Sequence, residues 1–233
     1  DSALGAATFS IGAGTTVDTG AAAIVNAGNN AQNWNGNFTF TGTNTLNLGT
    51  GAVTLGENVI ATISGQTLTV GGAIGDGVAT FGLTKTGAGV LLLNGDNTYG
   101  GAITLAAHST IGSDAGTLTL SGGITGTKDL TIVGAGHTSI VGNITTSPSA
   151  LTKSGAGTLF LSGTNSNFSG TTTINDGVVN VAYLTNNSVN GPLGAANDNA
   201  SKLILVGGTL QYTGNNATST DRNFTLLGNF TID

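Results

Sequence analysis

Short runs of alternating apolar and polar residues recur along the chain. Thr67-Leu68-Thr69-Val70, Thr117-Leu118-Thr119-Leu120 and Asp129-Leu130-Thr131-Ile132 each place an aliphatic side chain at every second position. Successive side chains of a strand point to opposite faces, so this period predicts short β-strands. One face of each strand is buried, and the other carries Thr or Asn in water. Clusters such as Gly75-Asp76-Gly77 separate the runs and tolerate the positive φ angles of tight turns.

Helical patterning is nearly absent. Residues 20–27 are the only candidate, and this stretch is short and contains the β-branched pair Ile24-Val25. Without helices to cross between strands, the chain does not fit an α/β fold. We therefore expect an all-β protein with almost no α-helix.

Two segments repeat each other, residues 83–105 and residues 151–182. The run Leu83-Thr84-Lys85-Thr86-Gly87-Ala88-Gly89 returns as Leu151-Thr152-Lys153-Ser154-Gly155-Ala156-Gly157, and each copy continues through an aliphatic run to an aromatic residue, Tyr99 or Phe168. A longer echo relates residues 1–41 to residues 190–233. Repeats that cannot bury a face alone must stack on their neighbours. We expect residues 1–233 to form a single solenoid segment that is part of a longer array.

Two architectures accommodate such strands: a parallel β-solenoid and an antiparallel sandwich or barrel. Small residues at the corners and the absence of regular two-residue hairpin loops favour the solenoid. At roughly twenty residues per coil, the chain would make on the order of ten coils.

Charge and composition exclude several classes of partner. The net charge is −6, and the five basic residues (Lys85, Lys128, Lys153, Lys202 and Arg222) are dispersed. A surface that binds nucleic acid or anionic lipid needs clustered Lys and Arg, so we expect neither partner. No apolar run approaches the roughly 20 residues that span a bilayer, so we expect no membrane insertion in this segment. The absence of cysteine removes disulfides and thiolate metal sites.

Residues 151–182 resemble the autotransporter-associated β-strand repeat found in passenger regions of large bacterial surface proteins. The residues that carry the resemblance are Leu151–Gly163, Asn167–Ile174 and Gly177–Val181. The copy that begins at Leu83 matches as far as Leu105 and then departs. The resemblance implies a right-handed parallel β-helix on the outside of a Gram-negative type cell, either anchored to the outer membrane or secreted. It also implies that such passengers serve mainly as stalks, adhesins or spacers.

The glycine-rich motif of the repeats is not a phosphate-binding loop, because its Lys precedes the glycines and a strand follows. We interpret Lys85 and Lys153 as solvated residues at a tight corner. His108 and His137 have no Cys or acidic cluster beside them in sequence, which indicates surface histidines. Asx turns explain the acids near Gly or Asn, although Ca²⁺ at a solenoid corner stays an alternative; these acids are Asp76, Asp96, Asp176 and Asp198. We therefore name no catalytic, cofactor-binding or metal-binding residue.

Three further patterns suggest structural or binding roles. Asn residues at the expected turns predict side-chain hydrogen bonds along the solenoid axis; they are Asn29, Asn30, Asn97, Asn165, Asn175 and Asn187. Trp34 is either a platform for a sugar or a core residue, and its match with another hydrophobic residue favours the core. Irregularly spaced Thr-x-Thr runs weigh against an ice-binding solenoid and favour solvated strand faces.

These observations predict a non-catalytic extracellular structural β-solenoid that serves as a surface stalk, filament or adhesive segment. No polar cap is evident at Asp1 or Asp233, so we expect the ends to continue into further sequence or to associate end to end or laterally with other copies. The alternative is an adhesin module that binds carbohydrate or host matrix through a loop surface or an exposed aromatic such as Trp34 or Tyr99. A carbohydrate-active enzyme or an ice-binding solenoid is less favoured, because the acids and bases are too scattered to form a pair.

Overall fold

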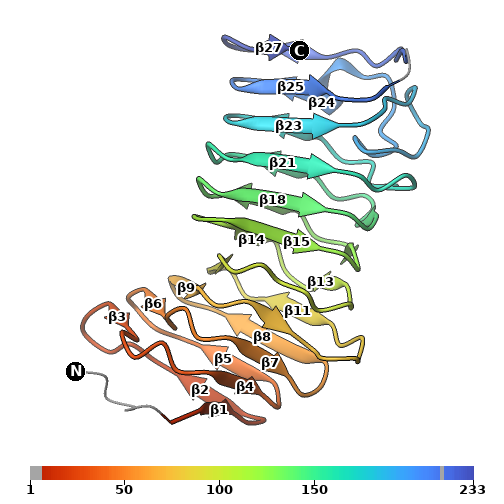
Figure 1. Cartoon of the computed structure of the whole chain (residues 1–233). Helices are drawn as coiled ribbons and strands as arrows, with labels where there is room; N and C mark the ends of the chain where they lie inside the picture. Colours follow the sequence, from red (N-terminus) through yellow and green to blue (C-terminus); the bar gives the residue numbers. More distant parts are fainter. Residues whose placement is uncertain (1–6, 216–217) are drawn as a thin grey trace.

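The computed structural model describes residues 7–215 and 218–233, which form a parallel β-solenoid (Figure 1). The expected all-β fold is confirmed. In the described part of the chain the only helix is a single 3₁₀ turn, Ala200–Lys202. Residues 20–27, the one helix candidate, instead contain a short strand at Ile24–Val25.

Every described strand pair is parallel, and the strands form four sheets. The four-stranded sheet comprises β1 (Phe9–Ile11), β4 (Gln32–Trp34), β7 (Val53–Leu55) and β10 (Ile74–Gly75). The seven-stranded sheet comprises β2 (Thr15–Val17), β5 (Phe38–Phe40), β8 (Val59–Ile63), β11 (Leu83–Thr86), β13 (Ile103–Leu105), β16 (Ile124–Gly126) and β19 (Ile144–Thr145). The ten-stranded sheet comprises β3 (Ile24–Val25), β6 (Leu46–Asn47), β9 (Thr67–Val70), β12 (Val90–Leu93), β14 (Ser109–Gly112), β17 (Leu130–Val133), β20 (Leu151–Lys153), β22 (Thr172–Ile174), β24 (Leu203–Leu205) and β26 (Thr225–Leu226). The six-stranded sheet comprises β15 (Thr117–Leu120), β18 (His137–Ile140), β21 (Thr158–Leu161), β23 (Val178–Val181), β25 (Thr209–Tyr212) and β27 (Thr231–Ile232).

Each coil contributes strands to two or three of these sheets. The first coils use the four-, seven- and ten-stranded sheets in turn, and the middle coils use the seven-, ten- and six-stranded sheets. The seven-stranded sheet ends at β19, so the described strands of the last coils alternate between the ten- and six-stranded sheets. Register partners such as Leu83 with Ile103 and Leu130 with Leu151 lie about one coil apart in sequence. Because the ten-stranded sheet takes one strand from each coil, the predicted number of coils is also confirmed.

The stack bends part of the way along its length. In Figure 1 the coils from β1 to β11 are set at an angle to the coils from β14 to β27. At this level the four-stranded sheet ends at β10 and the six-stranded sheet begins at β15. Residues 96–101 lie between these two strands in sequence and form no strand, but the Thr98 N–H still donates to the Ile74 carbonyl of β10 at 2.8 Å.

Inward-facing side chains fill the interior of the stack. Trp34, Phe40 and Phe168 are completely buried, and the ring of Trp34 meets that of Phe38 edge-on at 4.9 Å between centroids. The expectation that Trp34 is a core residue is therefore confirmed. Tyr99 is also buried, with 1% of its surface exposed. An adhesin that stacks sugar on Trp34 or Tyr99 is therefore wrong, because neither ring reaches the surface.

Glycines at the corners allow one coil to lie directly on the next. A Cβ added at Gly157 would lie 1.8 Å from the carbonyl oxygen of Gly136 in the preceding coil, and one added at Gly72 would lie 1.9 Å from that of Gly51. Both distances are far inside van der Waals contact, so only glycine fits. The abundance of glycine in this chain thus follows in part from backbone stacking.

The two sequence repeats occupy different faces of the solenoid. The first begins in β11 of the seven-stranded sheet, whereas the second begins in β20 of the ten-stranded sheet. Within each copy the first strand pairs with the third and the second with the fourth. The same local fold is thus used twice with an offset of one face. The longer echo, residues 1–41 with residues 190–233, stays a prediction, and its residues 1–6 and 216–217 lie outside the described part of the chain.

Candidate functional site

Lys85 lies inside the solenoid, so our interpretation of it as a solvated corner residue is wrong. Its side chain is 0% exposed and stands in an inward-facing row between Ala61 and Leu105. The Nζ donates to the carbonyl oxygens of Thr86 at 3.2 Å and Gly87 at 2.7 Å. The reason is the strand period itself, because Lys85 follows Leu83 by two residues and must share its face.

Lys153 repeats this arrangement in the second copy. It is 2% exposed, and its Nζ donates to the carbonyl oxygens of Gly155 and, at 3.4 Å, of Asp176. Burial lowers the pKa of the Lys85 ammonium to about 8. Burial also lowers the pKa of Lys153, although the negative charge of Asp176 raises it in part. Each repeat therefore buries one amine whose hydrogen bonds fix the carbonyls of the glycine corner.

The aromatic corner of each repeat replaces a strand pairing with a side-chain bond. The Oδ1 of Asn97 accepts from the Ile74 N–H at 2.8 Å, and the Oγ of Ser166 accepts from the Ile144 N–H at 3.0 Å. Two residues further along, Tyr99 and Phe168 turn into the core. In both repeats a side-chain oxygen thus accepts a hydrogen bond from one backbone N–H of the preceding coil.

The turn acids bind backbone groups of the same chain. Asp76 is buried, and its Oδ2 accepts from the Phe81 and Gly100 N–H groups, both at 3.0 Å. Asp176 Oδ1 accepts from the Gly177 N–H at 2.7 Å. Asp198 differs, because its contact is through its own backbone carbonyl, which accepts from the Asn223 side chain. Within residues 7–215 and 218–233, no three His, Cys, Asp or Glu side chains gather in a group that could hold a metal.

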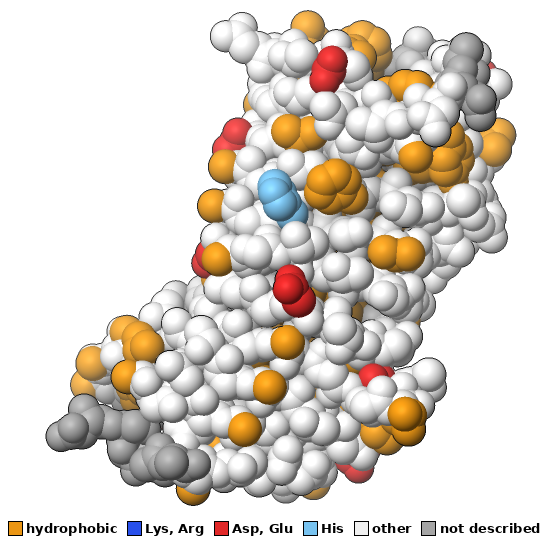
Figure 2. All heavy atoms as spheres, viewed as in Figure 1, with side chains coloured by type: hydrophobic (Ala, Val, Ile, Leu, Met, Phe, Trp, Pro, Cys, Tyr) orange, Lys and Arg blue, Asp and Glu red, His pale blue; other side chains and the backbone are white. Residues whose placement is uncertain are grey.

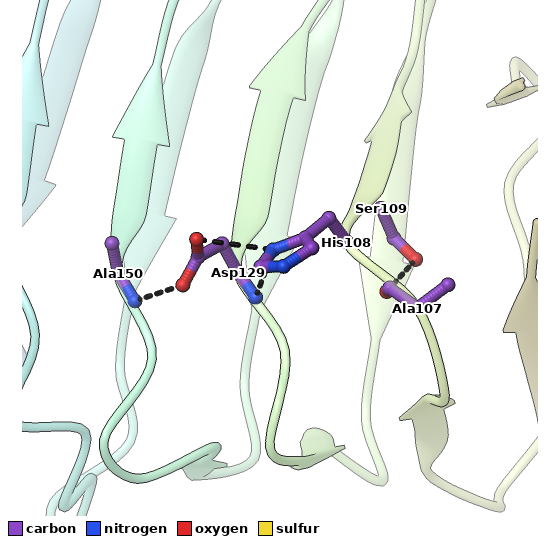
Figure 3. A network of polar contacts seen from close by, with 5 residues as sticks. All are labelled: Ala107, His108, Ser109, Asp129 and Ala150. Carbon is purple, nitrogen blue, oxygen red and sulfur yellow. Dashed lines mark hydrogen bonds and ion pairs between the residues drawn. The ribbon is translucent and has the colours of Figure 1, made fainter. Parts of the chain in front are cut away.

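A polar network crosses three successive coils (Figure 3). His108 Nδ1 lies 3.0 Å from Oδ2 of Asp129, whose Oδ1 accepts from the Ala150 N–H at 2.8 Å. His108 Nδ1 also lies 3.3 Å from the Asp129 N–H. A protonated imidazole can donate to the carboxylate, whereas a neutral one can accept from the backbone. The expectation of a surface histidine is confirmed, since 73% of the His108 side chain is exposed. Its acidic neighbour comes from the next coil, 21 positions along the chain.

The second histidine is also an exposed axial acceptor. His137 Nδ1 accepts from the Thr158 N–H at 3.2 Å, and its ring meets that of Phe160 edge-on at 6.0 Å. Like His108, it links neighbouring coils from the outside.

Asn side chains do bond along the axis, but mostly to backbone groups. Asn29 Oδ1 accepts from the Thr50 N–H at 2.9 Å, and Asn175 Nδ2 donates to Ser154 Oγ at 3.0 Å. Asn190 Nδ2 donates to Asn165 Oδ1 at 2.7 Å, an amide-to-amide contact between coils. Asn30 donates to the Ala7 carbonyl, and Asn187 uses its own N–H to reach Asp221. The predicted axial bonding is therefore correct in direction, with backbone groups as the usual partners.

Sequence reasoning missed the role of Arg222. Its guanidinium donates to the carbonyls of Gly194 at 2.6 Å, Thr185 at 3.1 Å and Asn186 at 3.3 Å. These acceptors all lie in residues 182–199, the long connection between β23 and the 3₁₀ turn before β24. The single arginine is thus the side chain around which this loop is organised.

Comparison with known proteins agrees with this architecture. The passenger-associated-transport-repeat model matches residues 83–107 and 151–181, the two segments that bury a lysine. The adhesin BmaC autotransporter of Brucella suis biovar 1 (strain 1330) is 43% identical over 65 residues, which are 28% of this chain and 2% of that protein. No solved structure matches. The family model covers these two segments, about a quarter of the chain, and they are similar to passenger-associated transport repeats.

Proposed function

We propose that this chain is a non-catalytic structural segment of an autotransporter-type passenger, one that acts as a rigid spacer at the cell surface or in a secreted protein. The observation that carries the proposal is the ten-stranded parallel sheet, which runs through the stack with one strand per coil. In such a ladder the backbone hydrogen bonds lie along the long axis, so the backbone itself resists extension and bending.

The use made of the charged side chains supports a structural role. Three buried charged side chains form hydrogen bonds with backbone groups; they are Lys85, Lys153 and Asp76. Asp129 links two coils on the outside of the solenoid. The face in Figure 2 consists largely of uncharged side chains and backbone, with few and scattered acids. A general acid and a general base must both reach one substrate. These charged groups instead form hydrogen bonds with the backbone of the solenoid.

An adhesive role is the second candidate, and the name of the Brucella relative, an adhesin, favours it. Self-association fits the exposed apolar side chains of the last coil, such as Leu226, Leu227 and Ile232.

No helix in the described residues is long and apolar enough to cross a membrane.

The spacer role is tested by its length. We would display the chain between an N-terminal epitope and a surface anchor and measure the distance of the epitope from the membrane by super-resolution imaging. Ten coils at a strand spacing of about 4.8 Å predict an added distance of about 48 Å. A flexible linker of equal residue number serves as the control, since it gives a broad distribution of distances. A distribution as broad as that of the linker would contradict the spacer role.

A further inference from the structure

A shallow groove of about 390 Å³ crosses the first five coils on the corner that follows the ten-stranded sheet. Asn26, Asn29, Asn47, Gly49 and Asn94 are among the residues that line it, and they come from three different coils. At about 4.8 Å per coil, a groove over five coils is about 19 Å long. In Figure 1 the edge that carries β3, β6 and β9 faces the inner side of the bend, and the outline of Figure 2 is hollowed there.

Three amides in this groove have an unused donor. Asn29, Asn47 and Asn94 each use Oδ1 to accept from a backbone N–H, those of Thr50 at 2.9 Å, Gly49 at 2.8 Å and Asp114 at 2.7 Å. Those bonds fix the orientation of each side chain and leave its NH₂ group without a protein acceptor in the described structure. The groove thus presents a row of oriented hydrogen-bond donors along the axis.

The remaining lining is neutral. None of the described residues that line the groove is charged, and Val25, 66% exposed, adds an apolar surface at one end together with Ala27. Gly49 and Gly71 keep the floor flat, since neither has a side chain. Fixed amide donors beside small apolar surfaces suit a ligand with many oxygen acceptors and nonpolar C–H faces. An anionic ligand would find no cation in this groove, and the chain has a net charge of −6.

We propose that this groove binds a neutral, hydroxyl-rich oligosaccharide that lies along the solenoid axis. The NH₂ groups of Asn29, Asn47 and Asn94 donate to its oxygen atoms, and Val25 contacts a sugar face. This proposal goes beyond the spacer role, which needs no ligand and would stand if the groove bound nothing.

The test uses the whole chain and neutral gluco-, manno- and galacto-oligosaccharides of four to six units, with the matching uronic-acid oligomers alongside. Binding is measured by saturation-transfer NMR and then by titration calorimetry. Asn47→Asp and Asn94→Asp are the informative variants, because each keeps the oxygen that caps the backbone and removes the donor. Asn58→Asp is the matched control: Asn58 Oδ1 accepts from the Gly82 N–H at 2.7 Å in the same way, outside the groove.

We expect a neutral oligosaccharide to bind, with affinity about tenfold lower in either groove variant and unchanged in Asn58→Asp. Thr50→Leu, which narrows the groove from an exposed position, should weaken binding as well. Circular dichroism of each variant separates loss of the site from loss of the fold. The proposal is overturned if no neutral oligosaccharide binds, if uronic acids bind more tightly, or if Asn47→Asp and Asn94→Asp, folded, bind as the parent chain does.

Discussion

The side-chain oxygen of Asn97 accepts a hydrogen bond of 2.8 Å from the backbone N–H of Ile74, which lies in the preceding coil. Ile74 is completely buried and Asn97 is 3% exposed, so water cannot substitute for this acceptor. Ser166 does the same for Ile144 in the second repeat. In each repeat, the turn before the buried aromatic therefore supplies the hydrogen-bond acceptor for a buried backbone N–H of the preceding coil.

Asn97→Ala should lower the free energy of unfolding by about 1–3 kcal/mol, because it leaves the buried Ile74 N–H without an acceptor. Urea unfolding measures the loss, and hydrogen exchange should show faster exchange at the Ile74 amide. Asn58→Ala, which removes a similar acceptor at an exposed site, should cost less than about 1 kcal/mol. Equal losses in the free energy of unfolding for the two variants would show that the buried Asn97 hydrogen bond adds no stability beyond that of an exposed one.

The buried lysines should make the protein more stable in mild alkali. The folded-state pKa of Lys85, about 8, lies below the value near 10.5 of a free lysine. Between these values the unfolded chain binds more protons, so the free energy of unfolding rises with pH. The expected gain is about 1–2 kcal/mol between pH 7.5 and 9.5. Above about pH 10 the gain should reverse, because burial raises the pKa of Tyr99.

Lys85→Met should remove most of this gain, since Met does not titrate, and should leave the smaller part that Lys153 supplies. Lys128→Met is the control, because Lys128 is only half-buried and lies outside the repeats. Urea midpoints at three pH values suffice. A gain that persists undiminished in Lys85→Met would refute the assignment to this residue.

Much of the fold can be predicted from the sequence because its signals are local. Alternating residues such as Thr117–Leu120 define strands by period two, and glycines define corners. The same period could have located Lys85 in the core, since it lies two residues after Leu83. Lysine is generally exposed, and that expectation outweighed the period of the strand. Burial is tolerated here because the corner carbonyls accept hydrogen bonds from the amine, and the sequence does not show this.

Other features depend on how far one coil is displaced from the next, which no local pattern specifies. His108 and Asp129 are 21 positions apart and meet only because the intervening coil closes at that length. The groove on the first coils arises in the same way, from Asn residues brought together by stacking. The one-face offset between the two repeats also reflects the summed lengths of several coils.

Gly87→Ala tests the close stacking of coils. Gly87 has φ +77°, and an added Cβ would lie 2.3 Å from the Ile63 carbonyl oxygen. Gly14 has the same φ of +77° with nothing within 4 Å of an added Cβ. Gly14→Ala should therefore cost about 1–2 kcal/mol for backbone strain alone. Gly87→Ala should cost more than about 4 kcal/mol in thermal or urea unfolding. Similar costs would mean that the coils separate without penalty.

Arg222→Lys should loosen the loop between β23 and β24. A lysine cannot fork to the carbonyls of Thr185, Asn186 and Gly194 together. Hydrogen exchange by mass spectrometry should rise at least tenfold in residues 182–199 and stay unchanged in β17 to β21. Unchanged exchange in the loop would show that its own turns hold it without the arginine.

The central claim, that the chain is a spacer whose length is set by the number of its coils, is tested most directly by lengthening it. Residues 124–143 form one coil, because Ile124 is in register with Ile144. Three extra tandem copies of residues 124–143 should fold and increase the maximum dimension in solution X-ray scattering by about 14 Å. A protein that unfolds, or that carries the added residues as disordered chain without this increase, would contradict the claim.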